Sequence, residues 1–457
     1  MKGERPVSKL YFHGGAGGVT GANYILEVGD YRLMIDCGLF QGGRFAERQN
    51  LEPFSYDPAR VHSLFVTHAH IDHIGRIPKL YSDGFRGVIY STPPAADLAR
   101  VMLEDALKIM EHEIEKEGGA CLYSRHDLTE ALKLFQPVDY DTEIRLPGGI
   151  TATLRNSAHI LGSAMIEIQT DSYKIVFTGD IGNTPTPLLN DIYPMKETDY
   201  LSMESVYGNR FHEGSEERHL ILERVIEDTV TKGGTIIIPT FALERTQALL
   251  AELNELIENN RIPRIPVFLD SPLAINATEV YKKHERYFNP QSQVAIQKGD
   301  DLFRFPGLVM TPSRQESQKI NKVEKSKIIM AGNPHGYGSR IMYHFARYLP
   351  DEHSTVLFVG FPRISSLGRR LTDGATEVRV QGRQTPVRAK IVNISSYSAH
   401  ADQTQLKNFV ARFAKPVKMV FATMGEETSA ETLARVIRDE LGINATVPKI
   451  GDMIPLD

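Results

Sequence analysis

The chain has 457 residues, of which 41% are hydrophobic, and carries a formal net charge of -5 at pH 7. This length allows two or three domains, and the charge excludes a strongly basic chain, although a local basic groove stays compatible with it. The two cysteines, Cys37 and Cys121, exclude a disulfide framework and indicate a reducing compartment. No apolar run has the length of a membrane span or the form of a signal peptide, so we expect a cytoplasmic protein with no membrane partner.

Short apolar runs separated by turn residues fill the first two hundred residues and predict β-strands. These runs are 24–28, 32–35, 64–66, 87–90, 164–168 and 175–177. Residues 95–117 carry apolar side chains at helical spacing and predict a helix. The glycine-rich residues 14–18 lack the Gly-Lys-Ser/Thr of a phosphate-binding loop, so their spacing favours a hairpin turn.

The next part of the chain alternates predicted helices and strands. Helical patterns at 216–230 and 242–257 alternate with predicted strand segments at 233–239, 267–270, 327–330 and 355–359. This alternation predicts a small parallel-sheet domain. Residues 388–392 and 418–422 then resemble the strands predicted in the first two hundred residues. We therefore predict one domain, 1–207 and 386–457, interrupted by a second domain, 208–385.

The most informative segment is 67–73, which directly follows the predicted strand 64–66. It places three imidazoles and a carboxylate within six positions, in the order His68, His70, Asp72 and His73. Crowding these groups at a strand end is costly unless something binds them. Imidazole and carboxylate are the ligands that divalent metals of intermediate softness prefer, zinc above all. The segment therefore predicts a metal site.

Two further segments can supply metal ligands. His159 lies in a turn of small residues between two predicted strands, and Asp180 follows the apolar run 175–177. Each signal alone is weak, because single histidines and Gly-Asp turns are common. Together with the segment 67–73 they form a strong set for a site with two metal ions.

These motifs make the chain resemble the metallo-β-lactamase superfamily and, within it, the β-CASP nucleases. The first resemblance rests on Asp36, the segment 67–73, His159 and Asp180, and the second rests on Glu204 and His400 in their motifs. Segments 239–245, 269–274 and 367–371 look like the β-CASP insert. The resemblance implies an α/β fold, namely an αββα sandwich with an inserted Rossmann-like domain and a cleft between the two.

The resemblance also implies roles for single residues. His68, His70 and His159 would hold one zinc ion, Asp72 and His73 a second, and Asp180 would bridge the two, with Mn²⁺ as an alternative metal. The pair would generate hydroxide that attacks an RNA phosphodiester in the cleft. Asp36 would orient the ligands, and His400, oriented by Glu204, would protonate the leaving oxygen or clamp the phosphate. The candidate catalytic residues are Asp36, Asp72, Glu204 and His400.

One departure from the family pattern is Met424, which stands where members that act on RNA usually carry a histidine ligand of the second metal. A thioether is a poor zinc ligand. Three interpretations stay open: a weakened second site, a homologue that binds nucleic acid without cleaving it, and an enzyme that acts on DNA, since DNA-directed members tend to have an apolar residue there. The surrounding sequence favours single-stranded RNA over DNA.

Residues of the predicted insert are candidates for contacts with the nucleic acid. His335, Ser339, Arg340 and Arg369 form this group, although a solvated loop or basic face explains them equally well. A small-molecule hydrolase of the same superfamily is a further alternative, which the long insert disfavours. The resemblance is also compatible with a homodimer.

Overall fold

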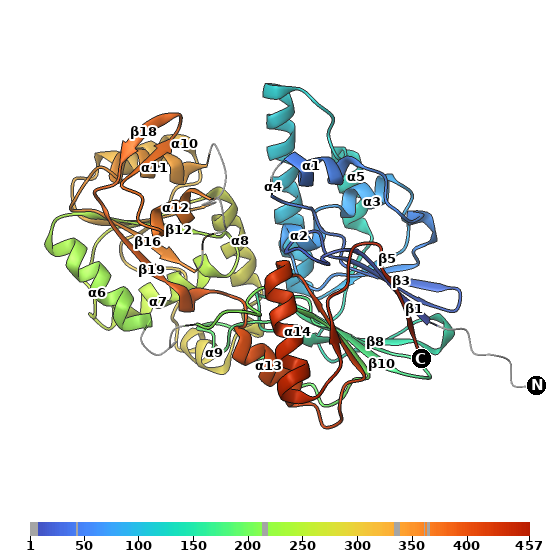
Figure 1. Ribbon diagram of the computed structural model, residues 1–457. Helices are drawn as coiled ribbons and strands as arrows, with labels where there is room; N and C mark the ends of the chain where they lie inside the picture. The colour runs from blue at the N-terminus through green and yellow to red at the C-terminus, as the bar shows by residue number, and fades with distance from the viewer. Residues whose placement is uncertain (1–7, 43, 213–217, 333–338, 361, 363–365) are drawn as a thin grey trace, which may run out of the picture. The chain divides into compact units, whose positions relative to one another are not determined.

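The structure is a computed structural model that describes residues 8–42, 44–212, 218–332, 339–360, 362 and 366–457 (Figure 1). The chain divides into two compact units. The first unit comprises Met1–Pro185, Asn190–Phe211 and His400–Asp457, and the second comprises Thr186–Leu189 and His212–Ala399. No helix among the described residues is long and apolar enough to cross a membrane.

The first unit contains, within the described residues, two seven-stranded mixed sheets. The first sheet has the order β22-β1-β2-β3-β4-β5-β6, antiparallel up to β3 and parallel beyond it. Its strands are β1 (Ser8–Gly14), β2 (Asn23–Val28), β3 (Tyr31–Ile35), β4 (Ser63–Phe65), β5 (Val88–Ser91), β6 (Phe135–Pro137) and β22 (Met453–Leu456). Of the glycine-rich residues 14–18, Gly14 ends β1 and the other four lie in the connection to β2, which pairs antiparallel with β1.

The second sheet has the order β21-β20-β11-β10-β9-β8-β7. Its strands from β10 to β21 run parallel, and the others run antiparallel. The strands are β7 (Glu143–Arg145), β8 (Thr151–Asn156), β9 (Ala164–Gln169), β10 (Lys174–Phe177), β11 (Tyr200–Glu204), β20 (Met419–Thr423) and β21 (Ala445–Thr446).

Apolar side chains of both sheets interlock in one core. Leu10 and Phe12 of β1 belong to the same buried cluster as Ile175 and Phe177 of β10. The intervening Val176 belongs to a second cluster, which joins the other face of the second sheet to α13 (Gln403–Ala411) and α14 (Glu427–Leu441). Burial on both faces explains why residues 175–177 of β10 form a continuous apolar run, whereas β1 alternates buried and partly exposed residues.

Helices cover the outer face of the first sheet (Figure 1). They are α1 (Arg44–Leu51), α2 (Ile71–Ile74), α3 (Ile77–Ser82), α4 (Pro93–Glu117) and α5 (Arg125–Lys133). The start of helix α4 is well capped: the Thr92 side chain accepts a hydrogen bond from Ala95 N–H, and Pro93 occupies the first turn. Two helix layers around two sheets confirm the predicted αββα sandwich.

The second unit is built on a parallel six-stranded sheet, counted over the described residues, in the order β14-β13-β15-β12-β16-β19. Its strands are β12 (Thr235–Thr240), β13 (Val267–Asp270), β14 (Leu308–Met310), β15 (Lys327–Gly332), β16 (Thr355–Val359) and β19 (Lys390–Ile394). The hairpin β17 (Glu377–Val380) and β18 (Arg383–Pro386) lies outside this sheet. The doubly wound order confirms the predicted Rossmann-like insert.

The helices of the second unit connect these parallel strands. They are α6 (Arg218–Thr231), α7 (Arg245–Glu258), α8 (Pro272–Lys283), α9 (Pro290–Gln297), α10 (Arg314–Lys319), α11 (Arg340–Tyr348) and α12 (Leu367–Thr372). The helix α11 packs Ile341 and Phe345 onto the sheet, against Ile237 and Ile329. Glu244, directly before α7, has φ +65 and ψ -65, an unfavourable backbone conformation for a residue with a side chain.

One strand assignment needs correction. The sequence suggested that residues 388–392 rejoin the first domain, but β19 pairs parallel with β16 in the sheet of the second unit. The compact units therefore change at residues 211/212 and 399/400, whereas the domain limits predicted from the sequence are 207/208 and 385/386. An apolar run carries no information about its partner strand, which explains the difference. Glu216, in the predicted helix 216–230, lies outside the described residues.

Candidate metal centre

Polar side chains from several strand ends of the first unit come together at one place. Asp36 follows β3, residues 67–73 follow β4, Asp180 follows β10, and Glu204 is the last residue of β11. His159 lies in the connection between β8 and β9. The carboxyl ends of neighbouring parallel strands meet at the same edge of a sheet, which brings Asp36 close to residues 67–73 in the first sheet and Asp180 close to Glu204 in the second.

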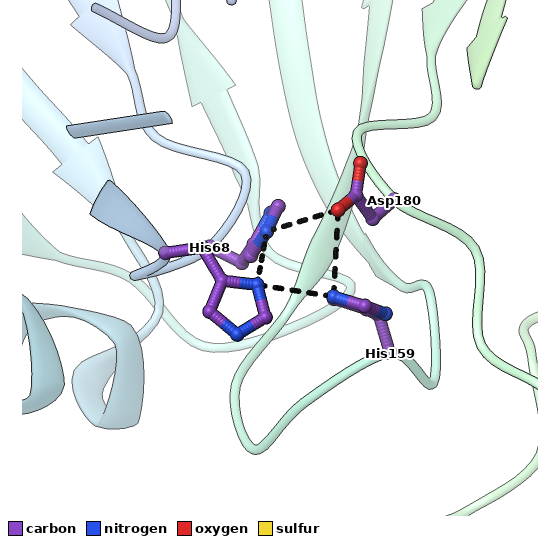
Figure 2. A group of neighbouring side chains, drawn as sticks. His68, His159 and Asp180 are labelled. Atoms are coloured by element: carbon purple, nitrogen blue, oxygen red, sulfur yellow. Dashed lines mark hydrogen bonds and ion pairs between the residues drawn. The ribbon is translucent and has the colours of Figure 1, made fainter. Parts of the chain in front are cut away.

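Four of these side chains point toward one another from three segments. His70 Nδ1 lies 3.1 Å from His68 Nε2 and 3.2 Å from His159 Nε2. Asp180 Oδ2 lies 3.4 Å from His68 Nε2 and 3.4 Å from His159 Nε2. Figure 2 shows His68, His159 and Asp180 directed at a common point. The three imidazoles and the carboxylate thus form a compact group of donor atoms.

The spacing of these donors fits a tetrahedral metal ion. With metal–ligand bonds of about 2.0–2.1 Å, the donors of a tetrahedral zinc site lie roughly 3.3 Å apart. The four separations above lie close to this value. Three facing imidazole nitrogens cannot all satisfy one another by hydrogen bonds, because each neutral ring has only one donor and one acceptor nitrogen. A cation would accept the lone pairs of all three rings.

A second pair of atoms lies on the other side of Asp180. His73 Nε2 is 3.4 Å from Asp180 Oδ1, and both atoms are buried without a hydrogen-bond partner among the described residues. The other ring nitrogen, His73 Nδ1, lies 2.7 Å from Asp36 Oδ2. This carboxylate–imidazole pair directs Nε2 toward Asp180, as expected of a ligand that is oriented by an outer carboxylate. Asp72 immediately precedes His73 on α2.

The charges of these side chains favour a cation. Burial, reinforced by the neighbouring histidines, holds the pKa values of His68 and His70 well below their usual range. Burial also disfavours the charged form of His73, but the Asp180 and Asp36 carboxylates outweigh it and raise the pKa of His73 well above its usual value. The neutral imidazoles of His68 and His70 next to the Asp180 carboxylate are suited to hold a divalent ion, whereas a cation at His73 would displace the proton of that ring.

Glu204 and His400 form a second group beside Asp180. His400 Nδ1 lies 3.2 Å from Glu204 Oε1 and 3.8 Å from Asp180 Oδ2. The completely buried Glu204 carboxylate accepts hydrogen bonds from the backbone N–H groups of Ile181, at 2.6 Å, and Val206, at 3.3 Å. Burial and the nearby Asp180 raise the pKa of Glu204 well above its usual range. The fixed carboxylate orients one ring nitrogen of His400.

Met424 follows β20 and packs among apolar side chains. Its side chain is only 3% exposed and belongs to the core cluster between the sheets. Its backbone has φ +45, and its N–H donates to the Gly15 carbonyl at 2.7 Å. A Cβ at Gly15 would lie 2.7 Å from Met424 Sδ and 2.4 Å from the Tyr24 hydroxyl, so only glycine fits there. Position 424 therefore offers a buried thioether and no imidazole nitrogen.

The predicted nucleic-acid contacts all belong to the second unit. His335 lies outside the described residues, and Ser339 is the N-cap residue of α11. The Arg340 guanidinium donates to the Asp270 carboxylate and to the carbonyls of Thr311 and Pro312. Arg369 Nε donates to Asp373 at 2.8 Å. Both candidate arginines thus have partners within their own unit, and their contacts with nucleic acid stay a prediction.

Sequence reasoning missed two residues that shape the centre. Thr67 donates its backbone N–H and its hydroxyl to the Asp36 carboxylate, at 2.8 and 2.7 Å, and thereby fixes that group. Ser163 accepts the His159 N–H at 3.0 Å and stabilises the turn that carries this histidine. Hydroxyl residues directly beside the motifs were the only signal available for either role.

Comparisons with known proteins agree with this geometry. Three family models match consecutive parts of the chain: a metallo-beta-lactamase superfamily domain at residues 25–205, a Beta-Casp domain at 246–371, and a Zn-dependent metallo-hydrolase RNA specificity domain at 384–448. Ribonuclease TTHA0252 of Thermus thermophilus is 32% identical over 97% of this chain and 99% of its own length. The chain belongs to the β-CASP family of the metallo-β-lactamase superfamily.

Other relatives of this β-CASP protein extend the comparison. The transcription termination factor FttA of Methanosarcina mazei is 30% identical over 94% of this chain and 69% of its own length. A crystal structure of a protein of unknown function from Enterococcus faecalis covers 98% of this chain and 100% of its own, with a TM-score of 0.58 and 14% identity. At that identity, the likeness shows a shared fold. The match to a Zn-dependent metallo-hydrolase domain agrees with the His/Asp cluster.

Proposed function

We propose that this β-CASP protein is a metal-dependent ribonuclease that hydrolyses phosphodiester bonds of RNA. The observation that carries the proposal is the group His68, His70, His159 and Asp180, whose donor atoms have the spacing of a tetrahedral cation shell. The match of residues 384–448 to an RNA specificity domain and the likeness to a ribonuclease along nearly the whole chain support RNA as the substrate.

In this proposal, His68, His70, His159 and Asp180 would hold the first zinc ion. His73, Asp180 and Asp72 would hold the second, which Mn²⁺ could replace. A pair of such cations would supply Lewis acidity, which lowers the pKa of a water molecule and offsets negative charge on a phosphodiester. The remaining residues keep the ligands in place: Asp36 fixes the tautomer of His73, and Thr67 holds Asp36.

His400 is the proposed proton donor to the leaving oxygen. Its Nδ1 lies 3.2 Å from Glu204 Oε1, and this contact sets the orientation of the imidazole beside Asp180. The backbone N–H groups of Ile181 and Val206 hold the Glu204 carboxylate in one orientation, so the imidazole cannot rotate away without losing its partner. A positioned acid of this kind typically contributes 10²–10⁴-fold to a rate.

Cleavage of DNA is a second candidate, and a single observation favours it. Position 424 is apolar, as DNA-directed members of the family tend to be there, and the buried thioether of Met424 lies beside Gly15. The surrounding RNA specificity match outweighs this one position. The two candidates differ in their dependence on the ribose 2′-hydroxyl, which allows a protein to distinguish RNA from DNA.

The test compares hydrolysis of matched single-stranded RNA and DNA oligonucleotides by the full chain with added Zn²⁺ or Mn²⁺. We expect RNA cleavage that a chelator abolishes and that Asp180→Asn reduces by at least 10³-fold. A matched control is Asp171→Asn, which changes an exposed carboxylate of the same unit. Equal rates for wild type and Asp180→Asn would reject the metal centre, and turnover of a thioester instead of RNA would indicate a small-molecule hydrolase.

A further inference from the structure

The segment after Asp36 lies directly against the segment that carries Asp72 and His73. Cys37 N–H donates to the His73 carbonyl at 2.8 Å, and Leu39 N–H donates to the Ile71 carbonyl at 3.0 Å. The two segments approach so closely at Gly38 that an added Cβ would lie 1.5 Å from the Asp72 carbonyl oxygen. Backbone hydrogen bonds therefore hold residues 36–39 against residues 71–73, and the position of Asp36 depends on these bonds.

Arg76 also binds the segment that follows Asp36. Its backbone N–H donates to the Cys37 carbonyl at 2.9 Å, and its side-chain Nε donates to the Gly38 carbonyl at 2.5 Å. One residue thus binds two consecutive carbonyls of the segment that carries Asp36. No other side chain among the described residues donates a hydrogen bond to these two carbonyls.

The surroundings of Arg76 are unusual for a charged group. The residue is only 6% exposed, and it forms no ion pair with a described residue. Its guanidinium carbon lies 4.5 Å from the ring centre of Phe40 and 5.2 Å from that of Phe54. Burial of a cation without an acidic partner is costly, and contacts with two aromatic faces recover only part of the cost. A residue needed merely to fill this volume would be apolar.

We propose that Arg76 is a positioning residue for the second cation. It holds the 36–39 segment against α2, so that Asp36 stays within 2.7 Å of His73 Nδ1 and keeps His73 Nε2 directed at Asp180. The first cation does not depend on it in the same way, because three of its four ligands come from His68, His70 and His159. This inference rests on the proposed binding of a cation by His73, but not on RNA as the substrate.

The neighbouring Lys79 offers a matched control. Lys79 is also almost fully buried, and its Nζ lies 4.5 Å from the ring centre of the same Phe54. Its ammonium, however, pairs with Asp83, and among the described residues it donates no hydrogen bond to the carbonyls of Cys37 and Gly38 that Arg76 binds. Loss of Lys79 therefore removes a buried cation and an aromatic contact without removing the link to Asp36.

The experiment measures Zn²⁺ affinity of the full-length wild type, Arg76→Met and Lys79→Met by competition with a chelator, without RNA. We expect Arg76→Met to bind the second ion 10–100-fold more weakly and the first within a few-fold, as for changes of outer partners at metal sites. Lys79→Met should bind both ions like wild type. Circular dichroism and unfolding of the metal-free proteins report separately on folding.

Two further variants keep the test decisive if Arg76→Met does not fold. Arg76→Lys retains the positive charge beside the two rings but lacks the guanidinium Nε, so it should still weaken binding of the second ion. Phe54→Leu removes one of the two rings and should weaken this binding less. Wild-type affinity for the second ion in Arg76→Met or Arg76→Lys, or an equal loss in Lys79→Met, would overturn the proposal. A wild type that binds one ion would overturn it too, whereas two ions without RNA cleavage would reject only the proposed ribonuclease activity.

Discussion

His73 Nδ1 lies 2.7 Å from Asp36 Oδ2, although the two residues are 37 positions apart and both are almost completely buried. The carboxylate also accepts two hydrogen bonds from Thr67, so it cannot turn toward another partner. This pair determines which nitrogen of His73 carries the proton and which is available to a metal ion.

Replacing Asp36 with asparagine should weaken binding of the second cation by roughly 10–100-fold, because an amide holds the imidazole less firmly and supports its basicity less than a carboxylate does. Asparagine tolerates the positive φ of +56 at this position, so the backbone should stay intact. Equilibrium dialysis with Zn²⁺ measures the effect. The exposed Asp30→Asn in the neighbouring turn is the control, and equal affinities for the two variants would contradict the prediction.

Replacing His400 with glutamine should slow RNA cleavage by about 10²–10⁴-fold, the usual contribution of a positioned acid. Metal content should not change, because His400 is not one of the proposed ligands. The discriminating substrate is bis(4-nitrophenyl) phosphate, whose leaving group departs without a proton. If His400 protonates the leaving oxygen, the variant should lose far less activity on this ester than on RNA. Equal losses on both substrates would instead indicate that His400 binds the phosphate.

The histidine-rich segment could be predicted because its information is local. His68, His70, Asp72 and His73 follow one buried strand, and no ordinary strand end needs so many metal ligands. Asp36, Glu204 and His400 became candidates only through family likeness, since as single polar residues they carry no distinctive pattern. The parallel strands β3, β4, β10 and β11 then explain why residues so distant in sequence meet.

Other features of the centre could not be predicted because they depend on distant pairings. The backbone hydrogen bond between Cys37 and His73 requires the loop after β3 to meet helix α2, and neither segment contains a sequence signal for this contact. The rings that flank Arg76 come from Phe40 and Phe54, on separate loops. The same reason explains β19, whose apolar run suits either sheet until the pairing with β16 is known.

Replacing Met424 with histidine should tighten the second cation on the order of tenfold or more, because an imidazole is a direct zinc ligand and even outer partners change affinity 10–100-fold. Histidine is among the residues that accept positive φ more readily, so it suits the φ of +45 at this position. RNA cleavage should rise in parallel. Met424→Leu keeps the buried apolar volume and is the control; an unchanged metal content and rate in Met424→His would show that position 424 does not reach the metal.

The last prediction concerns the second unit and does not involve a metal. The Glu244 carboxylate is buried, accepts a hydrogen bond from the Tyr281 hydroxyl at 3.0 Å and lies in a strained turn. Burial raises the pKa of Glu244 to about 7, and the hydrogen bond from Tyr281 and the charge of Arg218 only partly oppose this effect. The folded chain therefore holds the Glu244 proton over a pH range in which the unfolded chain has already released it.

The sign of the pH dependence follows directly. Glu244 does not disfavour folding below the unfolded pKa of about 4.5, and the free energy of unfolding then falls as the pH rises through 7, by up to about 3 kcal/mol. Glu244→Gln keeps an acceptor for Tyr281 without the charge, so its stability advantage over wild type should be small at pH 5 and near its maximum at pH 8. Thermal unfolding at both pH values measures this difference. The exposed Glu255→Gln on α7 should track wild type at both, and a Glu244→Gln advantage that is the same at pH 5 and pH 8 would contradict the prediction.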